Sequence, residues 1–310
     1  MATLLDFRRR IRSVKSTQQI TRAMKFVAAA KLRRSQEGVF AARPYAHEIL
    51  RVLRSAAARI ESTAHPLLER RPEERVLVVV LTGDRTLCGA FNSNVLRRAT
   101  AFLRGKGSNK SQVIAIGKKG RNALKQGGWH FAGEYLNISG NVQFSHAKEI
   151  AAQIGKLYES SEVDAVYVVY HEFKNVLVQN LLTEKLLPID PSVLTTEAAQ
   201  TFRTGTAAHE EALPHDRAAS GESYVDYIYE EPVGEIFSGL LPRYLESEVY
   251  RILLESSAAE WAARMTAMDS ATRNASELID KLTLEMNKIR QAGITKELIE
   301  IVSGAASATS

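Results

Sequence analysis

Residues 243–303 read RYLESEVYRILLESSAAEWAARMTAMDSATRNASELIDKLTLEMNKIRQAGITKELIEIVS and contain no proline and a single glycine, Gly293. Alanine, leucine, glutamate, methionine, arginine and lysine fill most of this stretch, and these residues favour the α-helix. At about 1.5 Å per residue, a helix over the whole stretch is roughly 90 Å long, several times the length of a typical globular helix. A helix of that length cannot bury its surface in an ordinary core. The stretch therefore predicts a partner helix or an enclosing protein.

The N-terminal segment supplies a second long helix with the spacing of a coiled-coil seam. Its seam residues follow one another in steps of three and four: Leu4, Phe7, Ile11, Val14, Gln18, Thr21, Lys25, Ala28 and Leu32. The middle of the seam is polar, which either sets the register of the pair or marks where the coil faces something other than its partner helix. Further along the chain, Pro44 is expected to kink the helix or to end it near Arg43.

The C-terminal stretch repeats the same spacing and carries the opposite charge. Its predicted seam residues are Met268, Ala271, Ala275, Leu278, Leu282 and Ile289. Residues 1–59 hold fourteen basic and three acidic residues, a net charge of +11, whereas residues 244–310 hold seven basic and ten acidic residues, a net charge of −3. This difference favours pairing of the two ends with each other. The prediction is a two-helix coiled coil of the two ends, which is antiparallel only if the central domain returns the chain to the base of the first helix. Gly304 is the expected C-cap of the C-terminal helix.

Strands and helices alternate in the middle of the chain. The predicted strands are Val76–Leu81, Val113–Gly117, Val163–His171, Val176–Leu182 and Tyr224–Glu230, and the predicted helices are Asn92–Leu103, Arg121–Gln126 and His146–Tyr158. This order is typical of a Rossmann-like, doubly wound α/β domain. The domain boundaries are then 1–59 for the N-terminal coiled-coil helix, 73–231 for the α/β domain and 232–310 for the C-terminal helix. Within the α/β domain, the Thr- and Ala-rich segment 195–223 is expected to be a mobile loop.

Composition and motifs exclude several classes of function. The longest apolar run, Val76–Leu81, is much shorter than the about 18 residues of a membrane span. The helical pattern continues past Lys31, which argues against a transit peptide. The loop after the first strand lacks the Gly-Lys-Ser/Thr ending of a P-loop, and the histidines lack metal-ligand spacing. Cys88 has no histidine near it in sequence and is expected to be a small buried thiol. The sequence predicts no catalytic residue, no cofactor and no metal.

Several motifs closely resemble one known family, the gamma subunit of F-type ATP synthase. The motifs are IRSVKSTQQITRAMKFVAAAK at residues 11–31, Arg43-Pro44-Tyr45, DRTLCG at 84–89, AARMTAM at 262–268, Asn287-Lys288, RQAGITKE at 290–297 and IVSGA at 301–305. Together they span nearly the whole chain. The family loop is D-R-G-L-C-G, so Thr86 replaces the glycine at its third position, which is the second glycine of the loop when Gly83 is counted as the first. A backbone conformation with positive φ is therefore less expected at Thr86.

The resemblance implies a non-catalytic rotor in the central stalk of the bacterial type of ATP synthase. Ion flow would turn a ring of membrane subunits and the shaft with it, and the shaft would drive the catalytic beta subunits through different nucleotide affinities. The implied partners are the alpha, beta and epsilon subunits and the membrane c-ring. The implied place is the cytoplasmic face of the bacterial plasma membrane, without direct insertion into it and without nucleic acid.

By motif position, the resemblance also implies residues that contact the partner subunits. The implied coupling contacts are Met24, Lys25, Arg264, Arg290, Gln291, Thr295 and Glu297. The apolar end with Leu298, Ile301 and Val302 would be the upper bearing. Two other readings stay open at this point. The basic N-terminal helix is compatible with a coiled-coil nucleic-acid-binding protein, and the central domain with an α/β enzyme that has helical arms.

Overall fold

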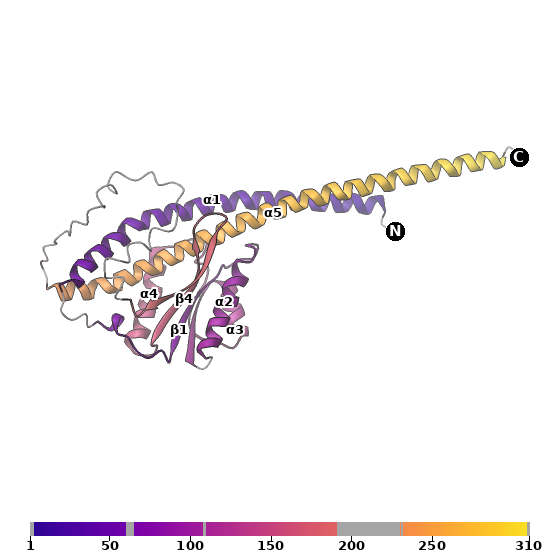
Figure 1. The fold of residues 1–310 in the computed structure, drawn as a ribbon. Helices are drawn as coiled ribbons and strands as arrows, with labels where there is room; N and C mark the ends of the chain where they lie inside the picture. The colour runs from indigo at the N-terminus through magenta and orange to yellow at the C-terminus, as the bar shows by residue number, and fades with distance from the viewer. Residues whose placement is uncertain (1–2, 60–64, 108–109, 191–229, 231, 309–310) are drawn as a thin grey trace. The chain divides into compact units, whose positions relative to one another are not determined.

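The computed structural model describes residues 3–59, 65–107, 110–190, 230 and 232–308, and the side chains of residue 300 and of residues 302–308 lie outside the description. Two long helices dominate the chain, α1 (Leu4–Ala57) and α5 (Val233–Ala308) (Figure 1). The chain divides into two compact parts. We name them the coil unit (residues 1–28 and 264–310) and the α/β unit (residues 29–263), and each is described by itself.

Two helices continue past an expected end. Of the two outcomes expected at Pro44, a kink or an end near Arg43, the end is wrong, because α1 continues through Pro44 to Ala57. Burial of Ile49, Leu50 and Leu53 after the proline stabilises the continued helix and outweighs the cost of proline in a helix interior, about 3 kcal/mol. Gly304 also lies inside a helix, because α5 continues to Ala308. The residues that follow Gly304 are mostly alanines, the best helix formers.

The coil unit is an antiparallel pair of helices. Lys25 of α1 pairs with Asp269 of α5, and Gln18 pairs with Ser276, so that residue numbers fall on one helix as they rise on the other. The predicted α1 seam is confirmed, because every one of its residues is buried or half-buried. On α5, Met268, Ala275 and Leu282 are buried as predicted.

Two predicted seam positions on α5 are wrong. Leu278 and Ile289 are exposed by 44% and 38%. Ile279 and Met286, each one turn from Leu282 or Ala275, are half-buried instead. A seam in steps of three and four admits either choice at such positions, and the partner helix decides between them.

The α/β unit is built on a five-stranded sheet in the order β3-β2-β1-β4-β5. The strands are β1 (Val76–Leu81), β2 (Ser111–Ile116), β3 (His130–Tyr135), β4 (Ala165–Phe173) and β5 (Gln179–Leu187). The first four strands are parallel, and β5 pairs with β4 in the antiparallel direction. Strands β1, β2 and β4 and their helices match the predicted elements. The predicted strand 176–182 begins three residues later, at Gln179, and β3 was not predicted.

Helices cover both faces of the sheet, as expected for a doubly wound domain (Figure 1). Helices α2 (Phe91–Lys106) and α3 (Lys118–Gln126) bury Val95, Leu103 and Leu124 against one face. On the other face, a second core joins α4 (Phe144–Glu159), the 3-10 helix η1 (Pro66–Leu68) and the parts of α1 and α5 that belong to the α/β unit. Strand β1 faces both cores and is buried along its whole length.

Some predictions fall on residues outside the description. They are the mobile loop 195–223 and the strand Tyr224–Glu230, of which only Glu230 is described. The domain boundaries 1–59, 73–231 and 232–310 stay a prediction. Among the helices that are described, none has a stretch long and apolar enough to cross a lipid bilayer.

Candidate functional site

The polar middle of the α1 seam faces its partner helix. Besides the Lys25–Asp269 ion pair, Gln18 Nε2 donates to Ser276 Oγ at 2.6 Å. The hydroxyls of Thr21 and Thr272 lie 2.8 Å apart. The hydrogen bond from Lys25 also lowers the pKa of Asp269. These contacts support the interpretation that the polar middle of the seam sets the register of the helix pair, because directional polar pairs favour one alignment of the two helices.

Most of the predicted contact residues lie on the surface of the coil unit. Arg290, Gln291, Thr295 and Glu297 are exposed. The Thr295 hydroxyl donates to the backbone oxygen of Gln291, within the helix. The polar groups of these residues are therefore accessible to solvent in the free chain.

Three further predicted residues differ in exposure from this set. Met24 is half-buried, and Lys25 engages Asp269. Arg264 is only 5% exposed. In the chain on its own, the Arg264 guanidinium is therefore not a surface group.

The C-terminal part of α5 exposes large apolar side chains. Leu298 is 57% exposed, Ile299 63% and Ile301 67%. Because Lys25 faces Asp269 and Gln18 faces Ser276, the first residue of α1 faces about residue 290, and no α1 residue lies beside the helix beyond that point. The side chain of Val302 lies outside the description. Exposed apolar groups that lie this close together mark an interaction surface.

In the α/β unit, Asp84 joins the loops that follow three strands. Its Oδ1 accepts hydrogen bonds from the backbone N–H groups of Lys118 and Asn137, each at 3.0 Å, and its Oδ2 accepts one from Ser139 Oγ at 2.9 Å. The backbone oxygen of Ser139 in turn accepts a hydrogen bond from Ser257 Oγ of α5. Asp84 thus braces the loops that follow β1, β2 and β3, and through Ser139 the brace reaches α5.

The loop from Asp84 to Gly89 avoids a positive φ at Thr86, as its sequence predicted. The positive values fall instead on Leu87, at 68°, and on Gly89, at 57°. Asn92 holds the loop from the following helix, since its Oδ1 accepts from Gly83 N and its Nδ2 donates to the Arg85 oxygen. The residue at position 86 therefore needs no positive φ in this loop, and threonine fits there.

Helix α5 fills the place where doubly wound sheets commonly bind ligands. That place lies outside the carboxyl ends of the strands where the strand order reverses, here between β1 and β4. A Cβ on Gly83 would lie 2.8 Å from the Glu260 side chain of α5, so the glycine permits this close approach. Cys88 is buried in a cluster with Phe91 and Ala259, which confirms the buried thiol. Within the described residues, no group of three or more His, Cys, Asp or Glu side chains is placed to hold a metal ion.

His171, near the end of β4, was not predicted as a special residue. Its ring stacks on Phe91 with the centroids 4.5 Å apart, and its Nδ1 has no hydrogen-bond partner in the described part of the chain. Burial lowers the pKa of His171 to about 4. The histidine is therefore neutral in the folded chain at neutral pH.

We expect His171 to make the α/β unit less stable in acid. Its folded-state pKa lies below the ordinary value of about 6.5, so the unfolded chain binds more protons between these values and the free energy of unfolding falls as the pH decreases. From pH 7 to pH 5 this loss is about 2 kcal/mol. Urea unfolding followed by tryptophan fluorescence measures it. The variant His171→Phe keeps an aromatic ring against Phe91 and should lose about 2 kcal/mol less over the same interval, and equal losses would contradict the prediction.

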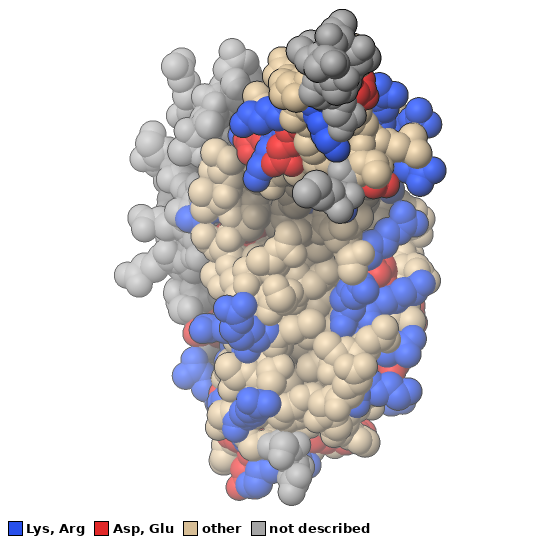
Figure 2. Space-filling model, turned by 90° about the vertical axis from the view of Figure 1, so that its right-hand side faces the viewer, with Lys and Arg blue, Asp and Glu red and all other residues tan. Residues whose placement is uncertain are grey.

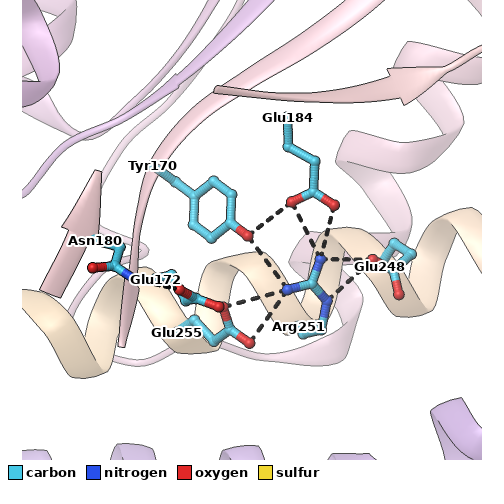
Figure 3. Close-up of polar contacts among 7 residues, drawn as sticks. All are labelled: Tyr170, Glu172, Asn180, Glu184, Glu248, Arg251 and Glu255. Atoms are coloured by element: carbon cyan, nitrogen blue, oxygen red, sulfur yellow. Dashed lines mark hydrogen bonds and ion pairs between the residues drawn. The ribbon is translucent and has the colours of Figure 1, made fainter. Parts of the chain in front are cut away.

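A half-buried charge cluster ties α5 to the antiparallel edge of the sheet (Figure 3). The Arg251 guanidinium lies 2.8 Å from Glu248, 3.3 Å from Glu255 and 3.4 Å from Glu184. It also donates to the Tyr170 hydroxyl, which donates to Glu184. Sequence reasoning missed this cluster, because its members come from β4, β5 and α5 and share no motif.

The pKa values of the cluster follow from burial and from the single cation. Burial acts to lower the pKa of Arg251, but the acidic partners around it raise that pKa well above its usual value. Burial raises the pKa of Glu255, and Arg251 opposes this shift. One guanidinium thus holds several carboxylates that would otherwise be costly to bury.

The comparisons with known proteins agree with one another. The sequence profile of the family described as ATP synthase matches residues 3–308. The ATP synthase gamma chain of Solibacter usitatus is 47% identical over 312 residues, which cover 99% of this chain and all of the relative. The ATP synthase gamma chain of Pelotomaculum thermopropionicum is 44% identical over 306 residues, or 99% of each chain.

Solved structures give the same picture of the fold. A chain from the cryo-EM structure of the central stalk and c-ring of Tetrahymena thermophila mitochondrial ATP synthase is 25% identical with a TM-score of 0.54, over 81% of this chain and 99% of that chain. A chain from Euglena gracilis mitochondrial ATP synthase, in rotational state 3, is 22% identical with a TM-score of 0.63, over 98% of this chain and 94% of that chain. None of these relatives supports the alternative of a nucleic-acid-binding protein. From the full-length match to its profile and its curated relatives, the chain belongs to the ATP synthase gamma chain family.

Proposed function

We propose that this gamma chain is the rotor shaft that couples ion flow through a membrane ring to ATP synthesis and hydrolysis on the beta subunits. The chain itself is a non-catalytic subunit of the central stalk, in keeping with the filled strand ends of its α/β unit. Two paired helices resist twisting better than one. The polar pairs of Gln18, Thr21 and Lys25 with α5 hold the register of the pair under torque.

The observation that carries this proposal is the apolar surface on α5 beyond about residue 290. An exposed row with Leu298 and Ile301 is unfavourable in water and favourable in an apolar socket. The catalytic head of alpha and beta subunits supplies such a socket. Val302 extends the bearing in sequence.

The polar residues nearby act as coupling contacts in this proposal. Arg290 and Gln291 donate hydrogen bonds to loops of the beta subunits, and Glu297 accepts them. Thr295 lies on the same exposed segment. Arg264, which is buried, acts on the shape of the shaft instead of touching beta directly.

The proposal also covers the remaining partners and the location, and membership of the family supports them. The α/β unit is placed at the base, on the c-ring and beside the epsilon subunit. The whole assembly lies on the cytoplasmic face of the bacterial plasma membrane, with this chain peripheral to the bilayer. Mixing the purified chain with alpha and beta subunits and separating the products by gel filtration tests the proposal. A stoichiometric complex with ATPase activity supports it, and a chain that elutes alone contradicts it.

We expect Met24→Lys to impair coupling more than folding. Met24 belongs to a second α1 stripe with Ile20 and Val27, both of which are exposed, and a charge there adds ionic contacts to a surface that must slide. ATP-driven proton pumping in reconstituted vesicles should fall several-fold relative to ATPase activity, with little change in chain stability. Gln19→Lys is the control, since Gln19 lies on the other side of the helix at 3.6 residues per turn. If both variants pumped alike, this stripe of α1 would not face the catalytic head.

A further inference from the structure

A cavity of about 90 Å³ lies in the α/β unit between α1, α5 and the end of β4. A single water molecule needs about 10–15 Å³, so the space is large enough for a small organic molecule. One part of its wall is apolar and includes Phe40 of α1, Phe173 of β4 and Leu254 of α5. The other part is polar and charged. The cavity therefore combines an apolar surface with a few polar groups, as small-molecule sites do.

Two polar side chains of the wall lack partners in the described part of the chain. Glu172 accepts a hydrogen bond from Asn180 Nδ2 at 2.9 Å (Figure 3), but no described Lys, Arg or His forms an ion pair with it. Ser247 is only 6% exposed, and none of the described residues forms a hydrogen bond with its hydroxyl. Polar groups that are removed from water without a partner cost free energy. A ligand that donates hydrogen bonds to both groups would recover this cost.

Both arginines of the wall are already engaged. The Arg251 guanidinium serves the three carboxylates of the charge cluster (Figure 3). Arg43 lies over the ring of Phe40, with its guanidinium carbon 4.8 Å from the ring centre. Burial raises the pKa of Glu255, and the negative charge of Glu172 adds to this shift, whereas Arg251 opposes it. The cavity is therefore short of positive charge, although Lys and Arg predominate on the face of the molecule in Figure 2.

The available acceptors of the wall match an ammonium group, which has three donors and no acceptor. Glu172 and Ser247 can each accept one hydrogen bond from it. The backbone oxygen of Phe40 is a third acceptor, because Pro44, one turn further along α1, has no N–H to serve as its regular helical donor. The described carboxylates are not placed to hold a metal ion, and the apolar part of the wall favours a ligand with a carbon chain.

We propose that this cavity binds a short aliphatic ammonium ion, with the charged end at Glu172 and Ser247 and the carbon chain against Phe173 and Leu254. Bound there, the ion contacts α1, α5 and β4 together, and it stabilises the α/β unit by mass action. This activity goes beyond the proposed rotor function and does not depend on it.

Titration of the full chain with n-butylammonium chloride at constant ionic strength, followed by NMR of the amine, tests the proposal. Ammonium chloride lacks the carbon chain, n-butanol lacks the charge, and sodium butyrate reverses the charge. We expect n-butylammonium to bind at a single site in the millimolar range. The other three compounds should bind at least about ten-fold more weakly, since each loses either the apolar contact or the charge-assisted hydrogen bonds.

Two variants with matched controls locate the site. Glu172→Gln removes the charge and keeps the shape of the side chain, so it should weaken binding of n-butylammonium about ten-fold. Glu149→Gln makes the same change at an exposed carboxylate of α4 and should leave binding unchanged. Ala46→Leu fills the cavity from α1 and should abolish binding, whereas Ala41→Leu, at an exposed position of the same helix, should not.

Several outcomes overturn the proposal. Unchanged binding by the Glu172→Gln and Ala46→Leu variants means that the amine binds elsewhere. Tighter binding of butyrate than of n-butylammonium assigns the cavity to anions through Arg43. Variants that keep amine binding but no longer assemble with alpha and beta subunits assign the cavity to a subunit contact. If the wild-type chain shows no saturable binding of n-butylammonium, the site is rejected and the proposed function is untouched.

Discussion

Replacing Leu298 and Ile301 with aspartate should lower the affinity of the chain for the catalytic head at least ten-fold and leave the folding of the chain itself unchanged. Both side chains are more than half exposed in the free chain, so their loss removes little burial there. In a complex, burying each of them fully is worth about 1.5–3 kcal/mol, and a factor of ten in affinity corresponds to about 1.4 kcal/mol. A carboxylate in the same socket adds a desolvation cost.

Titration of the head with labelled chain measures this affinity, and circular dichroism of the free chain reports its helix content. The control places aspartate at Asn274 and Asn287, two exposed positions of α5. It introduces the same two negative charges away from the apolar end. Unchanged affinity of the Leu298 and Ile301 variant would mean that this end of α5 stays in water in the assembled synthase.

The second large effect concerns the charge cluster in Figure 3. Replacing Arg251 with alanine should lower the free energy of unfolding of the α/β unit by about 3 kcal/mol, because removing one partner leaves buried charges uncompensated. The side chain of Arg251 is 20% exposed and that of Glu248 only 9%. The loss should shrink when the carboxylates of Glu248 and Glu255 are also replaced by glutamine amides, since fewer charges are then left without the guanidinium.

Urea unfolding followed by fluorescence is suited to this measurement, because both tryptophans, Trp129 and Trp261, lie in the α/β unit. Arg33→Ala serves as the control. Arg33 pairs with Glu37 on the surface of α1, where the side chains are 82% and 62% exposed, and such pairs contribute less than about 1 kcal/mol. Similar losses for the two arginine variants would show that the cluster is no stronger than a surface ion pair.

Regular patterns account for the elements that were predicted correctly. The α1 seam from Leu4 to Leu32 and the buried run Val76–Leu81 each repeat one period over many residues, and both were confirmed. Strand β3 was missed because His130–Tyr135 alternates weakly and lies at an edge of the sheet, where most of its residues are only half-buried. Pro44 and Gly304 misled the prediction because local preferences for ending a helix are worth a few kcal/mol and packing or neighbouring helix formers outweigh them.

The candidate site divides in the same way. The motif from Arg290 to Glu297 and the apolar residues Leu298 and Ile301 are contiguous on one helix, so they could be picked out from the sequence. The charge cluster and the unpaired Nδ1 of His171 could not, because each depends on groups that the topology brings together from separate strands and helices. Arg264 was assigned as a surface contact for the same reason: whether one helix position is buried depends on the distant residues that pack over it.

The sequence by itself determined that two long helices exist, that they pair along a seam, and that a doubly wound sheet lies between them in the chain. The periodicity of helices and strands is a local property of the sequence, and it does not depend on how the elements pack against one another. Tertiary structure alone decided that the strand ends are closed by α5 through Gly83 and Glu260, and that a single half-buried guanidinium collects carboxylates from both β5 and α5. Close approach and burial of charge are properties of residues far apart in sequence, and no pattern of neighbours encodes them.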